Sequence, residues 1–280
     1  MYSNTSYLPA KSLEKYIDRY YLFEKEDNDF FHLPKILPGT GLELVFHLET
    51  ALSVNNIVLP QAHTICPREG FSFDKTDKVS FLSVRFKSGR FRHFTKWSFL
   101  DLNDQFISVD KLWGKAGSNL VAQLKNIKSI EAKIRCIDTF LLKMFDENYN
   151  LDDEKWNPII DELYYQFNDI NLANLSSKLQ LSMRQFQRNF KSQFGITPKR
   201  FQQLARMQNI VRKGLLNNDK NYLNMIYDSG YFDQSHFIKE FKAMVKRKPL
   251  EYFNEQNFTT NFYHKSVNAN SNTKSKRHQS

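Results

Sequence analysis

Two segments of the chain repeat one residue pattern 51 positions apart, and this duplication constrains the fold more than any other feature. The repeat keeps a capping residue, two aromatic residues and a lysine, at Ser182, Phe186, Phe190 and Lys191 and again at Asp233, Phe237, Phe241 and Lys242. The same shift carries Pro198 to Pro249. Each copy predicts a short apolar helix, a tight turn, a capped second helix and a proline that stops it. The pattern is that of a helix-turn-helix unit, written twice.

The second helix of each predicted unit has two different faces. Phe186, Phe190 and Phe194 recur at helical spacing and predict the buried face. The polar face carries Arg184, Gln187, Arg188 and Lys191 in the first copy and Gln234, Ser235, Lys239 and Lys242 in the second. Arg and Gln near a helix N-terminus can read guanine and adenine edges, and basic residues further along suit phosphates. The alternative is that these polar faces are ordinary solvent-exposed helix surface without a partner.

The distribution of charge favours the DNA-binding interpretation over that alternative. Residues 1–155 hold 21 basic and 21 acidic side chains, whereas residues 171–250 hold 15 basic and 4 acidic ones. Such a one-sided excess points to nucleic acid or an anionic membrane as a partner. Residues 256–280 add basic residues and no acid, and predict a disordered basic tail.

Apolar patterning predicts a different architecture for the first half of the chain. The spacing of apolar residues from Leu13 to Tyr21 predicts an amphipathic helix, and the runs 42–48, 52–59 and 79–86 predict strands of a small antiparallel sheet or barrel. A helix is expected over 130–144, an acidic linker over 146–158, and a helix joining the two repeat units over 201–216. Two units on that stiff connector would address major-groove segments about 34 Å apart.

These elements predict an α+β chain with two domains and a tail. We expect a β-rich domain for sensing or dimerisation at 1–150, an all-α DNA-binding domain at 156–255, and the tail at 256–280. No apolar run is long enough to span a bilayer, and the N-terminus lacks a signal-peptide pattern. The two cysteines lie in no motif, so a reducing cytoplasm is the expected setting.

The second half of the chain resembles the C-terminal DNA-binding domain of AraC/XylS-type transcription regulators. The resemblance covers residues 172–253 and rests on "SMRQFQRNFKSQFGITPKRF", "LARMQNIVRKGLL" and "GYFDQSHFIKEFK". It implies that the base-reading positions are Arg184, Gln187 and Arg188 in the first unit and Gln234, Ser235, His236 and Lys239 in the second. Two residues depart from the family pattern: Lys246 stands where a glycine is usual, and Ile226 where a small residue is usual. A left-handed cap at Lys246 would cost about 1 kcal/mol.

The first half is similar to the upstream domain of a poorly characterised group of such regulators, through "LEKYIDRYYLFE", "ILPGTGLELVFHL" and "VSFLSVRF". In the family such domains are often cupin-like barrels that bind an effector or mediate dimerisation. The resemblance therefore implies three partners besides double-stranded DNA: a small-molecule effector, a second copy of the chain, and RNA polymerase.

The sequence offers little support for catalysis. The N-terminal histidines have no metal-ligand spacing, and no Gly-rich phosphate loop is present. Cys66 has Arg68 two residues on, which could activate a thiol as in a DNA-repair enzyme, although its flanking residues do not match such a site. We therefore predict a sequence-specific, effector-responsive transcription regulator with no enzymatic activity, cofactor or metal site. The alternatives are a DNA-binding repair or metabolic enzyme and an architectural protein without sequence preference.

Overall fold

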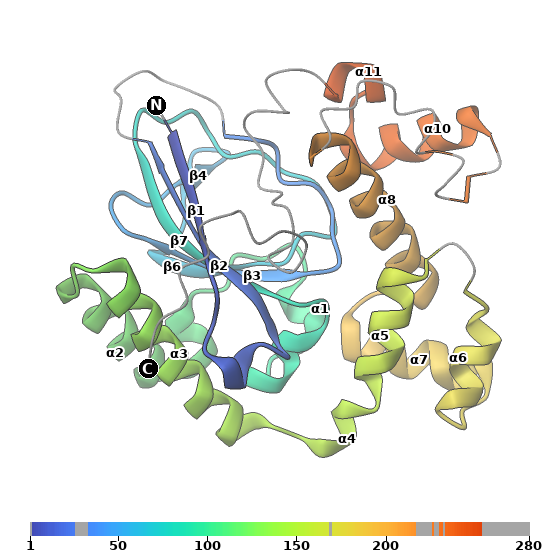
Figure 1. Cartoon of the computed structure of the whole chain (residues 1–280), viewed down its shortest axis with the longest axis horizontal. Helices are drawn as coiled ribbons and strands as arrows, with labels where there is room; N and C mark the ends of the chain where they lie inside the picture. Colours follow the sequence, from blue (N-terminus) through green and yellow to red (C-terminus); the bar gives the residue numbers. More distant parts are fainter. Residues whose placement is uncertain are drawn as a thin grey trace.

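The computed structural model describes residues 2–25, 33–167, 170–216, 226, 230–231 and 233–253 (Figure 1). The predicted tail at 256–280 lies outside the described residues. No helix in the described part is both long and apolar enough to cross a membrane.

The N-terminal half is built on a five-stranded antiparallel sheet in the order β1-β2-β7-β3-β6. Its strands are β1 (Tyr2–Tyr7), β2 (Ile17–Lys25), β3 (Leu42–His47), β6 (Ala62–Ile65) and β7 (Val79–Phe86). The short strands β4 (Ser53–Val54) and β5 (Ile57–Val58) form a separate hairpin. Among the described residues β1 and β6 are the two edges of the sheet, so the structure favours the sheet over the closed barrel.

Both faces of this sheet are covered by apolar packing. One face packs on α2 (Val109–Asn126), α3 (Ile130–Asn148) and the 3-10 turn η2 (Arg90–Phe94), with Leu44, Leu82 and Ile137 in the shared core. The other face packs through Tyr21, Val45 and Phe81 on the β4–β5 hairpin and on nearby loops. A further 3-10 turn, η1 (Lys11–Leu13), precedes β2, and the short helix α1 (Phe99–Leu102) follows η2.

The helix predicted from Leu13 to Tyr21 is wrong, because residues 17–25 form the strand β2. Seven of its nine residues are buried, since the strand has core on both faces. A strand covered on both faces reads as a continuous apolar run, and an apolar run can match a helical spacing by chance. The strands predicted over 42–48 and 79–86 are confirmed, and the run 52–59 forms the β4–β5 hairpin.

The acidic stretch predicted to be a linker over 146–158 is mostly helical. It contains the end of α3, the short helix α4 (Leu151–Glu154) and the start of α5 (Trp156–Tyr165). Its polar groups bind the N-terminal half: Tyr16 Oη donates to Glu154 Oε1 at 3.0 Å, and Arg92 Nη2 donates to the backbone carbonyl of Asp153 at 2.8 Å. The two halves are therefore joined by a packed helical connection.

The C-terminal half is all helical and has two apolar cores that share one long helix. This helix, α8 (Pro198–Leu216), contributes Phe201 and Ala205 to a core with α5, α6 (Leu172–Lys178) and α7 (Met183–Phe194). Its C-terminal part packs on α10 (Gln234–Val245) and α11 (Pro249–Tyr252). Figure 1 shows α8 leading from one group of helices to the other. The predicted joining helix is thus confirmed, and Pro198 and Pro249 also start the next helix, where proline is well tolerated.

Candidate nucleic-acid interface and inter-domain cavity

Helix α7 is fixed at both ends and along its buried face. Ser182 caps it as predicted: its side chain accepts from the Gln185 N–H, and the Gln185 side chain accepts from the Ser182 N–H at 3.0 Å. Phe186, Phe190 and Phe194 are buried against Trp156, whose ring stacks on Phe186 at 6.0 Å. Gly195 ends the helix in the left-handed conformation with φ 72°. A capping box at one end and a glycine at the other hold the helix in one register.

The opposite face of α7 is free to meet a partner. The four predicted contact residues, Arg184, Gln187, Arg188 and Lys191, are all exposed. Within the described part of the chain none of them forms an ion pair. An exposed basic face without internal partners can meet phosphates and base edges without first breaking a contact.

Helix α10 repeats this design in the second unit. Asp233 caps it, with its carboxylate accepting from the His236 N–H at 2.7 Å, and Phe237 and Phe241 are buried beneath. The predicted contact residues are all exposed: Gln234, Ser235, His236, Lys239 and Lys242. Most of the first helix predicted for this unit lies outside the described residues, but Ile226 is helical and fully buried.

Two features distinguish α10 from α7. Lys246, which stands where a glycine is usual, ends α10 in the left-handed conformation, with φ 61° and ψ 20°. His236 lies beside an ion-pair network: its Nε2 is 3.8 Å from Glu240 Oε2, which also contacts Arg206 Nη2 of α8 at 3.4 Å. The Arg206 guanidinium lies 4.4 Å from the centre of the Tyr231 ring. The His236 side chain therefore has a nearby partner within the protein, whereas Gln234 and Ser235 on the same helix project into solvent.

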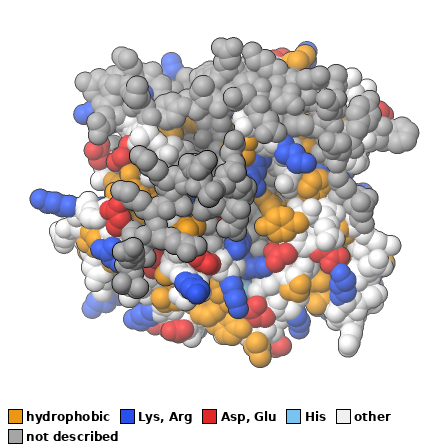
Figure 2. All heavy atoms as spheres, viewed as in Figure 1, with side chains coloured by type: hydrophobic (Ala, Val, Ile, Leu, Met, Phe, Trp, Pro, Cys, Tyr) orange, Lys and Arg blue, Asp and Glu red, His pale blue; other side chains and the backbone are white. Residues whose placement is uncertain are grey.

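Helix α8 sets the separation of the two units. Its 19 residues give it a length of about 28 Å. Because α8 belongs to both apolar cores, a force on α8 reaches both α7 and α10. Figure 2 shows one face of the molecule, on which the Lys and Arg side chains of the described residues are intermixed with carboxylates.

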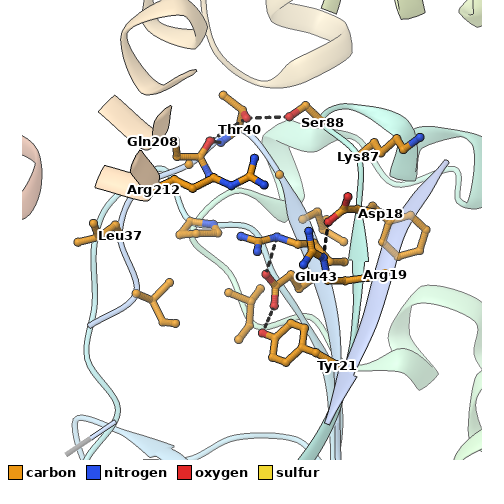
Figure 3. A pocket seen from close by; sticks show the side chains of 18 of the residues that line it. Asp18, Arg19, Tyr21, Leu37, Thr40, Glu43, Lys87, Ser88, Gln208 and Arg212 are labelled. Carbon is orange, nitrogen blue, oxygen red and sulfur yellow. Dashed lines mark hydrogen bonds and ion pairs between the residues drawn. The ribbon is translucent and has the colours of Figure 1, made fainter. Parts of the chain in front are cut away.

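A cavity of about 350 Å³ lies between the sheet and the C-terminal helices (Figure 3). The sheet contributes residues of β2, β3 and β7, and the other half of the chain contributes α5, α8 and Tyr252. Its volume is at the lower end of the range for small-molecule sites. Part of its lining is apolar, with Val45, Leu52, Ile65 and Phe81, which belong to one buried cluster.

The lining also includes paired charges. Glu43 accepts from Tyr21 Oη at 2.5 Å and from Ser83 Oγ at 2.9 Å, and it pairs with Arg85 at 3.3 Å. Asp18 pairs with Arg19 Nε at 2.7 Å. Burial would raise the pKa of Asp18, but the charges of Arg19, Arg85 and Arg212 outweigh it and leave that pKa lowered. The desolvation of Tyr21 and the nearby Glu43 carboxylate raise the pKa of Tyr21 well above its usual value.

A loop of the N-terminal half clasps α8 beside this cavity. Thr40 donates to Gln208 Oε1 through its N–H at 3.1 Å and its hydroxyl at 3.0 Å. A Cβ at Gly39 would lie 2.6 Å from Gln208 Nε2, so a larger residue there would displace the Gln208 amide from its present position. The same loop reaches α10, because Lys35 Nζ donates to the Val245 carbonyl at 3.1 Å.

The N-terminal half also contacts the end of α7. A Cβ at Gly195 would lie 2.2 Å from Asn103 Nδ2, and the Arg92 guanidinium lies 5.2 Å from the Phe194 ring centre. Gln193 donates to Asp153 Oδ1 at 3.2 Å. Helices α7 and α10 are thus both contacted at their C-terminal ends by groups of the N-terminal half.

The histidines and the cysteine that were considered as catalytic residues do not form an active site among the described residues. His47 and His63 face each other with Nε2 atoms 3.1 Å apart, and burial lowers their pKa values to about 3 and about 4. In the described part no group of three or more His, Cys, Asp or Glu side chains could hold a metal ion. Burial raises the pKa of the Cys66 thiol, the opposite of what an activated nucleophile needs.

Comparison with known proteins gives the two halves separate assignments. Residues 175–255 match a helix-turn-helix domain family, and residues 5–108 match a domain of unknown function (DUF6597). The HTH-type transcriptional activator RhaS of Mannheimia succiniciproducens is 32% identical over 258 aligned residues, covering 82% of this chain and 89% of that protein.

The chain belongs to the AraC/XylS-type family of transcription regulators. The probable transcriptional regulator LumQ of Photobacterium leiognathi is 27% identical, over 53% of this chain and 62% of that protein. The crystal structure of ToxT from Vibrio cholerae covers 90% of this chain and 96% of that one, with 15% identity and a TM-score of 0.41. A likeness at that level carries no argument about ligands. This AraC/XylS-type chain is a DNA-binding transcription regulator.

Sequence reasoning missed the polar residues of the cavity. Arg19 lies in the segment predicted to be a helix, and Gln208 and Arg212 lie on α8, which was expected only to join the two units. The available signal was Arg19 itself, a basic residue among apolar neighbours, because charged residues are rarely buried without a partner.

Proposed function

We propose that this regulator binds its operator by inserting α7 and α10 into successive major-groove segments. The observation that carries the proposal is the matched construction of the two helices: each has a cap, a buried Phe pair and an exposed polar face. Arg184, Gln187 and Arg188 are the proposed base-reading residues of α7, and Lys191 the proposed phosphate contact. On α10 these roles fall to Gln234, Ser235, His236, Lys239 and Lys242.

We further propose that a small effector in the inter-domain cavity controls this binding. The cavity is walled by both halves of the chain, so a ligand in it contacts α8 directly. Because α8 joins the two helix-turn-helix units, its position would determine the separation and the angle at which α7 and α10 meet DNA. The N-terminal half would then act by binding and not by catalysis, in the cytoplasm.

Association with other macromolecules completes the proposal. Dimerisation through the N-terminal half and contact with RNA polymerase are expected from the family resemblance. The basic residues of the segment 256–280 would add affinity for any DNA sequence through phosphate contacts. Light scattering of the protein with and without operator DNA measures whether the chain forms a dimer.

Selection of bound sequences from a random DNA pool tests the central proposal. The full chain should enrich one motif with two separated half-sites, and the double variant Arg184→Ala, Arg188→Ala should enrich neither that motif nor its first half. Arg135→Ala on the exposed surface of α3 serves as the control for charge loss and should behave as the parent chain. Retention of DNA without any enriched motif would refute the proposal and support an architectural protein.

A further inference from the structure

The C-terminal end of α10 carries positive charges that the first helix-turn-helix unit lacks. Residues 246–248, with the sequence Lys-Arg-Lys, follow α10 directly and are all exposed. The corresponding residues 195–197 after α7 are Gly-Ile-Thr and carry no charge. Cations stabilise the C-terminus of a helix through its dipole, but α7 ends without such a group of charges. The end of a recognition helix in this fold therefore does not require them.

A lysine of the N-terminal half adds a fourth charge at the same place. Lys35 Nζ donates to the Val245 carbonyl at 3.1 Å, so it lies beside the residue that precedes Lys246. An ammonium group has three N–H donors, and the bond to Val245 leaves two of them for another acceptor. Burial lowers the pKa of Lys35, and the charges of Arg247 and Lys246 lower it further, in agreement with like charges held close together.

Little negative charge compensates these four residues, which we call the α10 end cluster: Lys35, Lys246, Arg247 and Lys248. Within the described part of the chain none of the four forms an ion pair. Residues 242–253 contain one acid, Glu251, whose Oε2 accepts from the Lys248 N–H at 3.2 Å. The cluster keeps an excess of positive charge, so a bound anion would relieve the repulsion within it.

The α10 end cluster continues the polar face with which α10 is proposed to meet DNA. Lys242 is exposed and lies four residues before Lys246, so the two are on the same side of the helix, one turn apart. The C-terminal end of a recognition helix can lie against the DNA backbone, as in the homeodomain. Of the residues proposed to read bases on α10, Gln234 alone offers an amide fork, so we expect phosphate contacts to supply more of the affinity of this unit.

We infer that the α10 end cluster binds phosphates of the DNA backbone beside the second half-site, and that Lys35 thereby brings the N-terminal half into contact with DNA. The inference rests on the function proposed above. Lys and Arg side chains bind phosphate through charge-assisted hydrogen bonds. Because Lys35 is bonded to the carbonyl that precedes Lys246, a phosphate against Lys246 and Arg247 lies close to Lys35 as well. The bound DNA would then hold the loop of Lys35 against α10.

Binding titrations at several salt concentrations test the number of phosphates contacted. Each neutralised phosphate contributes about 0.9 to the slope of log affinity against log salt concentration. Lys35→Gln should lower the slope of the full chain by about 1 and leave preferences on a panel of single-base operator variants unchanged. Its loss of affinity relative to the parent chain should shrink about three- to fourfold between about 50 and about 200 mM salt. A slope equal to that of the parent chain would overturn the inference.

Conservative and neighbouring variants separate phosphate contact from a structural role. Lys35→Arg keeps the charge and should keep the parent slope, whereas a loss equal to that of Lys35→Gln would show that Lys35 only supports α10. The double variant Lys246→Gln, Arg247→Gln alters exposed residues and should lower the slope by about 1–2, so the test stays decisive if Lys35→Gln folds poorly. Lys115→Gln on the exposed surface of α2 is the matched control for the loss of one charge and should keep the parent slope.

Uncharged phosphate analogues locate the contact on DNA. Methylphosphonate groups placed one at a time beside the half-site assigned to α10 should weaken binding of the parent chain at one or two positions. At those positions the same substitution should cost Lys35→Gln less, because the partner of the phosphate has already been removed. Equal costs for the two proteins at every position would show that Lys35 does not contact DNA.

A duplex of random sequence separates this inference from the proposed function. Phosphate contacts do not depend on sequence, so Lys35→Gln should lower the salt slope on this duplex too. A lower slope without any motif enriched from the random pool would refute sequence-specific binding alone, whereas an enriched motif with unchanged slopes would refute the phosphate contact alone. Loss of transcription activation with all slopes unchanged would assign the α10 end cluster to an acidic protein surface instead.

Discussion

The left-handed residue at the end of α10 allows a prediction with a worked magnitude. Lys246 has φ 61° and ψ 20°, and its N–H donates to the Lys242 carbonyl at 3.0 Å. A side chain in this conformation costs about 1–2 kcal/mol. Lys246→Gly removes that cost but gives the unfolded chain more freedom, which offsets about 0.4–1 kcal/mol. We therefore expect the opening free energy of α10 to rise by about 0.5–1 kcal/mol.

Native-state hydrogen exchange of the α10 amides measures this change locally, which suits a chain with more than one cooperative unit. The variant should slow the exchange of these amides about two- to fivefold. Lys246→Ala is the matched control, because it removes the long side chain and keeps the Cβ that causes the strain. It should leave the exchange rates close to those of the parent chain.

The equivalent position in the first unit should respond in the opposite direction. Gly195 has φ 72°, and an added Cβ would lie 2.2 Å from Asn103 Nδ2 and 2.9 Å from the Phe99 carbonyl. Gly195→Ala should therefore destabilise α7 by about 2–5 kcal/mol, the sum of backbone strain and overpacking.

The two Lys246 variants decide whether the backbone conformation is the cause. Equal exchange of the α10 amides in Lys246→Gly and Lys246→Ala, or faster exchange in the glycine variant, would refute the reasoning.

Three other predictions follow from the site and the fold. Arg188→Ala should cost about 1–3 kcal/mol of operator binding and relax preference at one or two base pairs, whereas Lys239→Ala should lower affinity evenly across a panel of single-base operator variants; the reverse pattern would contradict the assignment. The pKa values of His47 and His63 are lowered to about 3 and about 4 by burial, so the unfolded chain binds more protons than the folded chain below about pH 6.5. Thermal stability should consequently fall as pH drops from 6.5 toward 4, and less so after His63→Gln; equal melting temperatures at pH 7 and pH 5 would argue against this. Gln208→Ala leaves a buried backbone N–H of the clasp unsatisfied, at a cost of about 1–3 kcal/mol, and should speed hydrogen exchange in the loop that holds α8. Unchanged exchange there would show that the clasp does not hold the two halves together.

The C-terminal half could be predicted from the sequence because its signals are local. A helix period, a capping residue and a proline each act within a few residues, and the duplication states each of them twice. The repeat also aligned Lys246 with Gly195, and both residues end their helices in the left-handed conformation. The turn of the first unit gave no such signal: Gln180 is left-handed there with φ 55°, although glycine is the usual residue for that conformation.

The N-terminal half was harder to predict because its elements depend on distant partners. β2 is a strand since β1 and β7 pair with it, and its apolar run alone does not distinguish a strand from a buried helix. The cavity combines residues of the sheet with residues of α5 and α8 that lie far along the chain. No local pattern relates Arg19 to Arg212, so only the assembled fold reveals that they border one space.

The contacts between the two halves decide what kind of regulation this architecture allows. The loop that carries Lys35 holds the C-terminal end of α10, and the residues around Asn103 hold the C-terminal end of α7. The predicted DNA-contacting side chains nevertheless all remain exposed. Among the residues that the structure describes, none covers these side chains, so under the proposed function an effector would not act by uncovering them. What it can change is the placement of α8 against the sheet, and through α8 the separation and angle of the two recognition helices. Under the proposed function both helices fit successive grooves of one rigid duplex, so a small change in that placement would alter operator affinity without altering any base contact.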